Sequence, residues 1–143
     1  MEYLSSSNDE TLEIGKQIAS TLQGGDIVLL YGELGAGKTT LTKGIANGFG
    51  ITEDITSPTF TLMNMYPVKN NASGIQTLVH IDTYRLENAQ ELLDIGVEDY
   101  LGSPDTITII EWPEKVESLV KNKKIISVYL NHVENETRKI TID

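Results

Sequence analysis

Hydrophobic and polar residues alternate along the chain in blocks that predict strands separated by helices. The run 27–31 (Ile-Val-Leu-Leu-Tyr) is uninterrupted and apolar, which is typical of a strand buried on both faces of a sheet. Other runs with strand character, several of them bounded by Gly, Pro or Asn, predict further strands over 60–68, 76–84, 106–112, 125–130 and 139–142.

Helical spacing of apolar residues predicts the segments between these strands. Near the start, Ser7 and Glu10 match a capping box, and a stripe of Leu12, Ile18, Ala19 and Leu22 follows. Ile14 and Gly15 interrupt the regular spacing of this stripe, so its boundaries are not sharply defined. The same spacing predicts helices over 41–49, 86–95 and 114–120.

The two strands over 60–68 and 76–84 are joined by a short turn-rich stretch at 69–74. They must pair antiparallel, because a parallel crossover needs a dozen or more residues. Residues 1–143 are enough for one domain with a substantial core. The pattern therefore predicts a single three-layer α/β domain over 1–143, whose mixed sheet contains an antiparallel hairpin.

The composition limits the kinds of partner that the protein is expected to bind. The formal net charge is -10, with 21 acidic and 11 basic residues, so the surface repels a phosphate backbone and little direct contact with nucleic acid is expected. The chain has no cysteine, no apolar signal segment at its start and no run near the ~18 residues of a membrane span. We expect a cytoplasmic protein without a membrane role.

The segment 32–39 (Gly-Glu-Leu-Gly-Ala-Gly-Lys-Thr) fits the phosphate-binding loop G-x-x-x-x-G-K-[ST]. Glycines allow the backbone N–H groups to approach an anion, because no Cβ blocks the way. Lys38 is placed to reach the β- and γ-phosphates, and the Thr39 hydroxyl to ligate Mg²⁺. Since a buried strand precedes the loop and a helix follows it, the sequence predicts a P-loop NTPase domain.

Two carboxylates end apolar runs where a nucleotide site needs an acid. Asp82 follows 78–81 and Glu111 follows 107–110. One is expected to ligate Mg²⁺ or its water, and the other to orient the attacking water or couple to the nucleotide. The sequence leaves this division open. His80 is interpreted as a structural rather than a catalytic residue. Trp112, next to Glu111, could pack under the site or present its ring to a partner, and a position in the core is favoured.

The segment Ser57-Pro58-Thr59 lies where P-loop proteins often carry a switch that senses the γ-phosphate; the alternative is a proline-bearing loop that enters a strand. Guanine-specific motifs are missing, because residues 122–125 lack the acid of N-K-x-D. Two function classes remain as alternatives to an ATPase. One is a small-molecule kinase, for which two arginines are few, and the other is a nucleotide-gated binding module without significant hydrolysis.

Four segments in this order resemble the bacterial TsaE (YjeE) family, whose members are the ATPases of tRNA threonylcarbamoyladenosine biosynthesis. The resemblance extends over nearly the whole chain, and the last three segments are its specific part. They are 32–40 (G-E-L-G-A-G-K-T-T), 57–62 (S-P-T-F-T-L), 80–86 (H-I-D-T-Y-R-L) and 111–114 (E-W-P-E).

The resemblance implies a protein that binds and hydrolyses ATP with Mg²⁺, slowly when alone. The family acts with the TsaD and TsaB proteins, which modify adenosine 37 of tRNAs reading ANN codons. By motif match, Thr39 and Glu111 would ligate Mg²⁺, and Ser57, Pro58 and Thr59 would form the switch. The implied catalytic residues are Lys38, Thr39, Asp82 and Glu111. The implied ATP-binding residues are Asn8, Leu34, Gly35, Ala36, Gly37, Lys38, Thr39, Thr40, Asp82 and Arg138.

Overall fold

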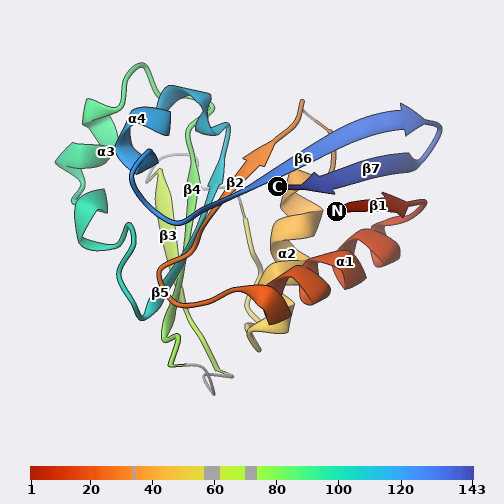
Figure 1. Cartoon of the computed structure of the whole chain (residues 1–143), viewed down its shortest axis with the longest axis horizontal. Coiled ribbons are helices and arrows are strands. Elements are labelled where there is room, and N and C mark those ends of the chain that lie inside the picture. Colours follow the sequence, from red (N-terminus) through yellow and green to blue (C-terminus); the bar gives the residue numbers. More distant parts are fainter. Residues whose placement is uncertain (34, 57–61, 70–73) are drawn as a thin grey trace.

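The structure, a computed structural model, describes residues 1–33, 35–56, 62–69 and 74–143. These residues form an α/β domain in which a twisted sheet lies between two layers of helices (Figure 1). The predicted three-layer α/β class is confirmed. Among the described residues, no helix is long and apolar enough to cross a membrane.

The strands and helices alternate along most of the chain. The strands are β1 (Glu2–Ser5), β2 (Ile27–Tyr31), β3 (Met63–Pro67), β4 (Thr77–Asp82), β5 (Thr106–Glu111), β6 (Ile125–Glu134) and β7 (Thr137–Ile142). The helices are α1 (Asn8–Thr21), α2 (Lys38–Gly48), α3 (Gln90–Asp94) and α4 (Glu117–Val120), with short 3₁₀ turns at Val97–Asp99 and Pro113–Lys115.

The sheet is mixed, with a parallel centre and antiparallel flanks. Within the described ranges its seven strands have the order β1-β7-β6-β2-β5-β4-β3. The central strands β6, β2, β5 and β4 run parallel, so their carboxyl ends meet at one edge. The predicted hairpin is confirmed, because β3 pairs antiparallel with β4.

Two apolar clusters lie on the two faces of this sheet. The helices α1 and α2 cover one face through residues such as Ile18 and Ile45, while Leu92 of α3 and Val120 of α4 help to cover the other. The strand β2 contributes to both clusters, since Val28 and Leu30 face one side and Ile27 and Leu29 the other. This explains why its sequence is apolar throughout.

The helices α1 and α2 pack closely because glycines face each other at their crossing. A Cβ at Gly15 would lie 2.7 Å from the Gly44 Cα, and a Cβ at Gly44 would lie 2.3 Å from the Leu12 carbonyl oxygen. The buried face of α1 therefore includes Gly15 and Ile14, which the predicted stripe did not count, while Leu12 is only half-buried. Since α2 begins at the phosphate-binding loop, this contact also positions the loop.

The predicted capping box at the start of α1 forms only in part. The Ser7 side chain accepts a hydrogen bond from the Glu10 N–H at 3.1 Å, as expected. The Glu10 carboxylate, however, accepts from the Ser6 N–H at 3.2 Å. The reciprocal bond of a capping box would go to the Ser7 N–H.

Several predicted boundaries differ from the structure; the strand expected over 76–84, for example, ends at Asp82. The helix expected over 86–95 covers only Gln90–Asp94, because the Leu86 carbonyl accepts from Lys115 Nζ at 2.7 Å, in a turn rather than a helix. The helix expected over 114–120 is divided into a 3₁₀ turn and α4 at Val116, whose φ is -126°.

Another wrong boundary lies at the carboxyl end. The polar residues expected as a turn between the last two strands instead continue β6 and β7, and the turn is reduced to Asn135 and Glu136. The strand β1, whose start is polar, was not predicted. It is held by antiparallel pairing with β7 at the edge of the sheet.

Candidate functional site

The phosphate-binding loop connects β2 to α2 at the carboxyl edge of the parallel strands. Gly35 and Gly37 adopt left-handed φ values of 81° and 100°, which residues with a Cβ rarely accept. Gly37 is the N-cap of α2 and forms no side-chain hydrogen bond with the first turn. The backbone N–H groups of this turn are therefore available to an anion, and the helix dipole favours negative charge there.

Lys38 opens α2 and is buried over the loop. Its Nζ donates to the carbonyl oxygens of Gly32 and, at 3.3 Å, of Glu33. The same Nζ lies 3.8 Å from the centre of the Trp112 ring. Burial lowers the pKa of Lys38, while the nearby charge of Glu111 opposes that change. A desolvated ammonium whose partners are uncharged is suited to exchange them for a phosphate.

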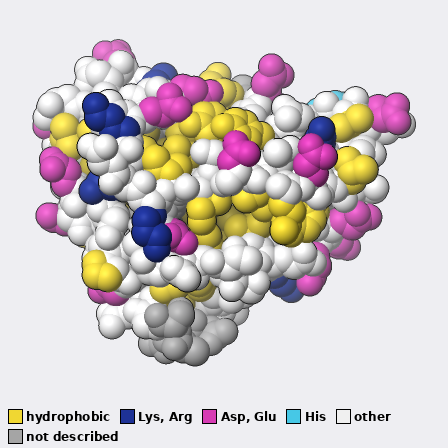
Figure 2. Space-filling view, in the orientation of Figure 1, with side chains coloured by type: hydrophobic (Ala, Val, Ile, Leu, Met, Phe, Trp, Pro, Cys, Tyr) yellow, Lys and Arg dark blue, Asp and Glu magenta, His cyan; other side chains and the backbone are white. Residues whose placement is uncertain are grey.

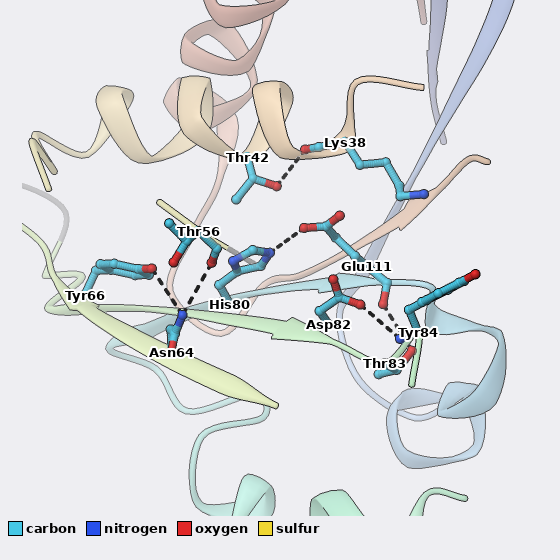
Figure 3. Close-up of polar contacts among 10 residues, drawn as sticks. All are labelled: Lys38, Thr42, Thr56, Asn64, Tyr66, His80, Asp82, Thr83, Tyr84 and Glu111. Carbon is cyan, nitrogen blue, oxygen red and sulfur yellow. Dashed lines mark hydrogen bonds and ion pairs between the residues drawn. The ribbon is translucent and has the colours of Figure 1, made fainter. Parts of the chain in front are cut away.

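The two predicted carboxylates are neighbours in the sheet. Asp82 ends β4 and Glu111 ends β5, and the parallel register pairs these two residues directly. The Asp82 Oδ1 accepts from the Tyr84 N–H at 2.9 Å. Burial raises the pKa of Asp82, and the charge of Glu111 adds to this. Lys38, Asp82 and Glu111 thus converge from three elements, as Figure 3 shows.

The loops that follow β4 and β5 are tied to each other. The Thr83 side chain, fully buried, donates to the Trp112 carbonyl and lies 3.1 Å from the Glu111 carbonyl. Trp112 has a left-handed φ of 58°, and its ring lies 5.0 Å from that of Tyr84. These hydrogen bonds between the two loops therefore hold the Trp112 ring beside Lys38, at the opening of the site.

His80 contacts Glu111 from within the core. The His80 Nε2 lies 2.6 Å from the Glu111 Oε2, and His80 is fully buried. The sequence interpretation had treated His80 as structural and did not foresee this partner. Side chains alternate between the two faces of a strand, so His80 and Asp82 must face the same side of the sheet. This spacing could have indicated that His80 lies near the site.

One cavity of about 330 Å³ brings together most of the predicted site residues. They come from α1, the loop, α2, β4, β5 and β7. The predicted residues that line the cavity are Asn8, Gly35, Gly37, Lys38, Thr39, Thr40, Asp82, Glu111 and Arg138. Glu33 and Tyr84 line it as well and were not predicted. Trp112 also lines it and is half-buried there, so the favoured core position was wrong and the alternative beside the site is the observed one.

Arg138 reaches the cavity from β7, far along the chain from the loop. Its Nη2 donates to the Gly35 carbonyl at 3.3 Å. Its Nη1 is buried and forms no hydrogen bond in the part of the chain that the structure describes. A guanidinium held against the loop with one unpaired nitrogen is a further donor for a phosphate oxygen.

The remaining predicted residues either do not line this cavity or lie outside the residues that the structure describes. Ala36 is buried under the loop and lines a neighbouring hollow of about 640 Å³ instead. Leu34, Ser57, Pro58 and Thr59 lie outside the described residues. Within the described ranges, no group of three or more His, Cys, Asp or Glu side chains is arranged to hold a metal ion. Mg²⁺ ligation by Thr39 and Glu111 stays a prediction.

Comparisons with known proteins agree on one family. The sequence model described as "Threonylcarbamoyl adenosine biosynthesis protein TsaE" matches residues 5–140. A protein of Treponema pallidum called tRNA threonylcarbamoyladenosine biosynthesis protein TsaE is 37% identical over 142 residues, which cover 99% of both chains. A protein of the same description from Streptomyces coelicolor is 37% identical over 134 residues, which cover 91% of this chain and 87% of the relative.

A solved structure shares the fold. The crystal structure of YdiB from Bacillus subtilis superposes with a TM-score of 0.71 and 28% sequence identity. The match covers 99% of this chain and 83% of that one. The mixed sheet and its two helical layers therefore recur in a protein known from experiment.

Proposed function

Since this chain belongs to the TsaE family, we propose that it is a P-loop ATPase that binds ATP with Mg²⁺ and serves tRNA threonylcarbamoyladenosine biosynthesis. It hydrolyses ATP weakly when alone. Together with TsaB and TsaD it supports formation of the threonylcarbamoyl group on adenosine 37 of tRNAs that read ANN codons. The whole range 1–143 acts as one ATPase domain, in the cytoplasm, where tRNA is modified.

The observation that carries this proposal is the convergence of cations and anions around one cavity. Lys38, Arg138 and the open N–H groups at the start of α2 supply positive charge and donors for phosphate oxygens. Asp82 and Glu111 face them from the ends of β4 and β5. Asn8 lines the cavity from α1, where we assign to it a contact with the part of the nucleotide beyond the phosphates.

The donor set around the loop fits Mg²⁺. This ion prefers oxygen ligands, and proteins hold it by one or two carboxylates together with substrate phosphates. The Thr39 hydroxyl and the Glu111 carboxylate line the same cavity and provide such oxygens. When bound, Mg²⁺ neutralises charge on the phosphates of ATP. We assign Glu111 as the ligand rather than Asp82 by the match of residues 111–114 to the family motif.

Asp82 orients the attacking water and accepts its proton. Burial raises the pKa of this carboxyl, with a contribution from the charge of Glu111, and a raised pKa makes a carboxylate a better base near neutral pH. Its Oδ1 is held by the Tyr84 N–H, so the side chain has a fixed orientation beside Glu111. These properties support a division of roles that the sequence left open.

The charge of the surface supports a protein partner over direct tRNA binding. The net charge of -10 disfavours a phosphate backbone, and Figure 2 shows carboxylates spread over the drawn face. Arg138 is the arginine that lines the cavity. Further stabilisation of the transition state therefore comes from the partner proteins, which accounts for weak turnover by the isolated chain.

Phosphate release from ATP tests the proposal. Free phosphate is measured with the purified protein alone, with TsaB and TsaD, and without Mg²⁺. We expect slow, Mg²⁺-dependent release that the partners stimulate at least about tenfold. Transfer of phosphate to an acceptor molecule would instead identify a small-molecule kinase. Tight ATP binding with no release under any condition would identify a nucleotide-gated binding module.

A further inference from the structure

The buried pair His80–Glu111 lies directly behind the proposed metal ligand. We propose that His80 is a positioning residue, which holds the Glu111 carboxylate in the orientation that ligates Mg²⁺; this rests on the proposed function. The contact joins Nε2 to Oε2 at 2.6 Å, and the exposed fractions of the two side chains are 0% and 4%. No solvent competes for a hydrogen bond in such a setting.

The sheet register explains how His80 reaches Glu111 and not Asp82. Asp82 and Glu111 are direct partners across β4 and β5, and His80 is paired with Ile109, two residues before Glu111. His80 therefore approaches the carboxylate from the interior of the sheet, while the cavity lies at the strand ends. One oxygen of Glu111 is held by His80, and the other is left for a ligand in the cavity (Figure 3).

The donor and acceptor types of the two side chains define the direction of the hydrogen bond between His80 and Glu111. A carboxylate accepts hydrogen bonds only, so the proton lies on the His80 Nε2. The His80 Nδ1 is buried and has no partner within the described ranges. The His80 ring thus holds one oxygen of the Glu111 carboxylate in place.

Core packing alone does not account for a histidine at this position. On the same face of the sheet, His80 lies beside Leu78 of β4 and is paired with Ile109 of β5, both fully buried and apolar. A leucine would fill such a site without an unpaired nitrogen, since burial of a polar group lowers stability unless it is hydrogen-bonded. In the part of the chain that the structure describes, the side-chain hydrogen bond of His80 goes to a proposed metal ligand. Outer partners of metal ligands typically contribute 10- to 100-fold to metal affinity or activity.

The test is a Mg²⁺ titration of nucleotide binding, measured by calorimetry with a non-hydrolysable ATP analogue. In His80→Leu the Mg²⁺ concentration for half-maximal tightening should rise about 10- to 100-fold, while affinity in EDTA changes less than about twofold. His80→Gln, whose Nε2 is placed to donate to the carboxylate, should stay within about threefold of wild type. In the Glu111→Ala background, His80→Leu should have no further effect on the titration.

Val79→Ala is the matched control, because it removes buried volume from the same strand on the opposite face. It should leave the Mg²⁺ midpoint unchanged. An unchanged midpoint in His80→Leu, equal midpoints in His80→Leu and His80→Gln, or an equal rise in Val79→Ala would each overturn the inference. If His80→Leu does not fold, His80→Asn, whose amide is too short to reach Glu111, takes its place.

Nucleotide binding by the wild-type protein distinguishes a failure of this inference from a failure of the proposed function. If wild-type protein binds the analogue with strong Mg²⁺ dependence and the His80 variants behave like it, only the role of His80 is wrong. If wild-type protein binds no nucleotide, or binds it without any effect of Mg²⁺, the proposed function fails and the inference fails with it.

Discussion

The Lys38 ammonium lies 3.8 Å from the centre of the Trp112 ring, so the loop cation and the aromatic residue after Glu111 form a cation–π contact. Such a contact is worth about 0.5–2 kcal/mol, depending on desolvation. Lys38 also donates to the Gly32 and Glu33 carbonyls. A phosphate that binds Lys38 must compete with these contacts, and Trp112 therefore reports on the position of Lys38.

Trp112 is the single tryptophan of the chain, so fluorescence excited selectively at tryptophan reports on the surroundings of this ring, which include Lys38. We expect ATP to change the emission, because the Lys38 Nζ moves from the ring toward the β- and γ-phosphates. The measurement is a fluorescence titration, with ATP binding followed in parallel by calorimetry. Unchanged emission at nucleotide saturation would contradict the expected movement.

Lys38→Ala should weaken ATP binding by about 10- to 100-fold, which corresponds to the loss of a charged hydrogen bond of about 1.5–3 kcal/mol. The fold should be retained, since burial of the ammonium is itself unfavourable. Calorimetry and circular dichroism measure the two effects. Lys43→Ala, an exposed lysine of α2, is the control and should bind like wild type.

Glu111→Ala should retain the fold and lose Mg²⁺-dependent turnover by at least about 100-fold, because the proposed metal ligand is removed. Phosphate release at increasing Mg²⁺ measures this loss. Glu98→Ala, at an exposed carboxylate outside the cavity, should have wild-type turnover. Wild-type hydrolysis in Glu111→Ala would remove Glu111 from the site.

Asp82→Asn should raise the free energy of unfolding at neutral pH and abolish turnover. A carboxyl whose pKa is raised in the folded state binds protons more tightly there than in the unfolded chain. Its ionisation therefore destabilises the fold, progressively as pH rises from the ordinary aspartate value through the raised one. Below the ordinary value of about 3.9 both states are protonated, and the advantage of asparagine should disappear.

Thermal unfolding of wild type and Asp82→Asn across this pH range measures the difference. The gain in stability should be largest near neutral pH and should vanish in acid. A difference that stays constant with pH would mean that the carboxyl charge is not its cause.

Gly44→Ala should destabilise the protein by about 1–3 kcal/mol, because the added Cβ would overlap the Leu12 carbonyl oxygen at the α1–α2 crossing. This outweighs the gain of about 0.5–1 kcal/mol in helix propensity. Urea unfolding measures the change. Asn47→Ala, on the exposed side of α2, provides the control and should be neutral or stabilising. Equal stability of both variants would show that α1 can move away at little cost.

Local sequence was sufficient for the elements whose chemistry is contiguous. The strand β2, the glycine loop and the start of α2 follow each other without a gap, so their residue types define both structure and chemistry. The hairpin β3–β4 followed from its short connection. The carboxyl ends of β4 and β5 were predicted from apolar runs that end in an acid, and their pairing confirmed that Asp82 and Glu111 are neighbours.

The sequence by itself determined the family, the phosphate-binding loop and the acids at the strand ends, because these depend on residues close together in the chain. Only the tertiary structure decided that Arg138 reaches Gly35 and that His80 holds Glu111. It alone also decided that Trp112 lies against Lys38. These contacts arise from strand order and register. The two hydrogen bonds join residues that are 103 and 31 positions apart in the sequence. No local pattern encodes such distances, since they depend on how the whole sheet buries its two faces.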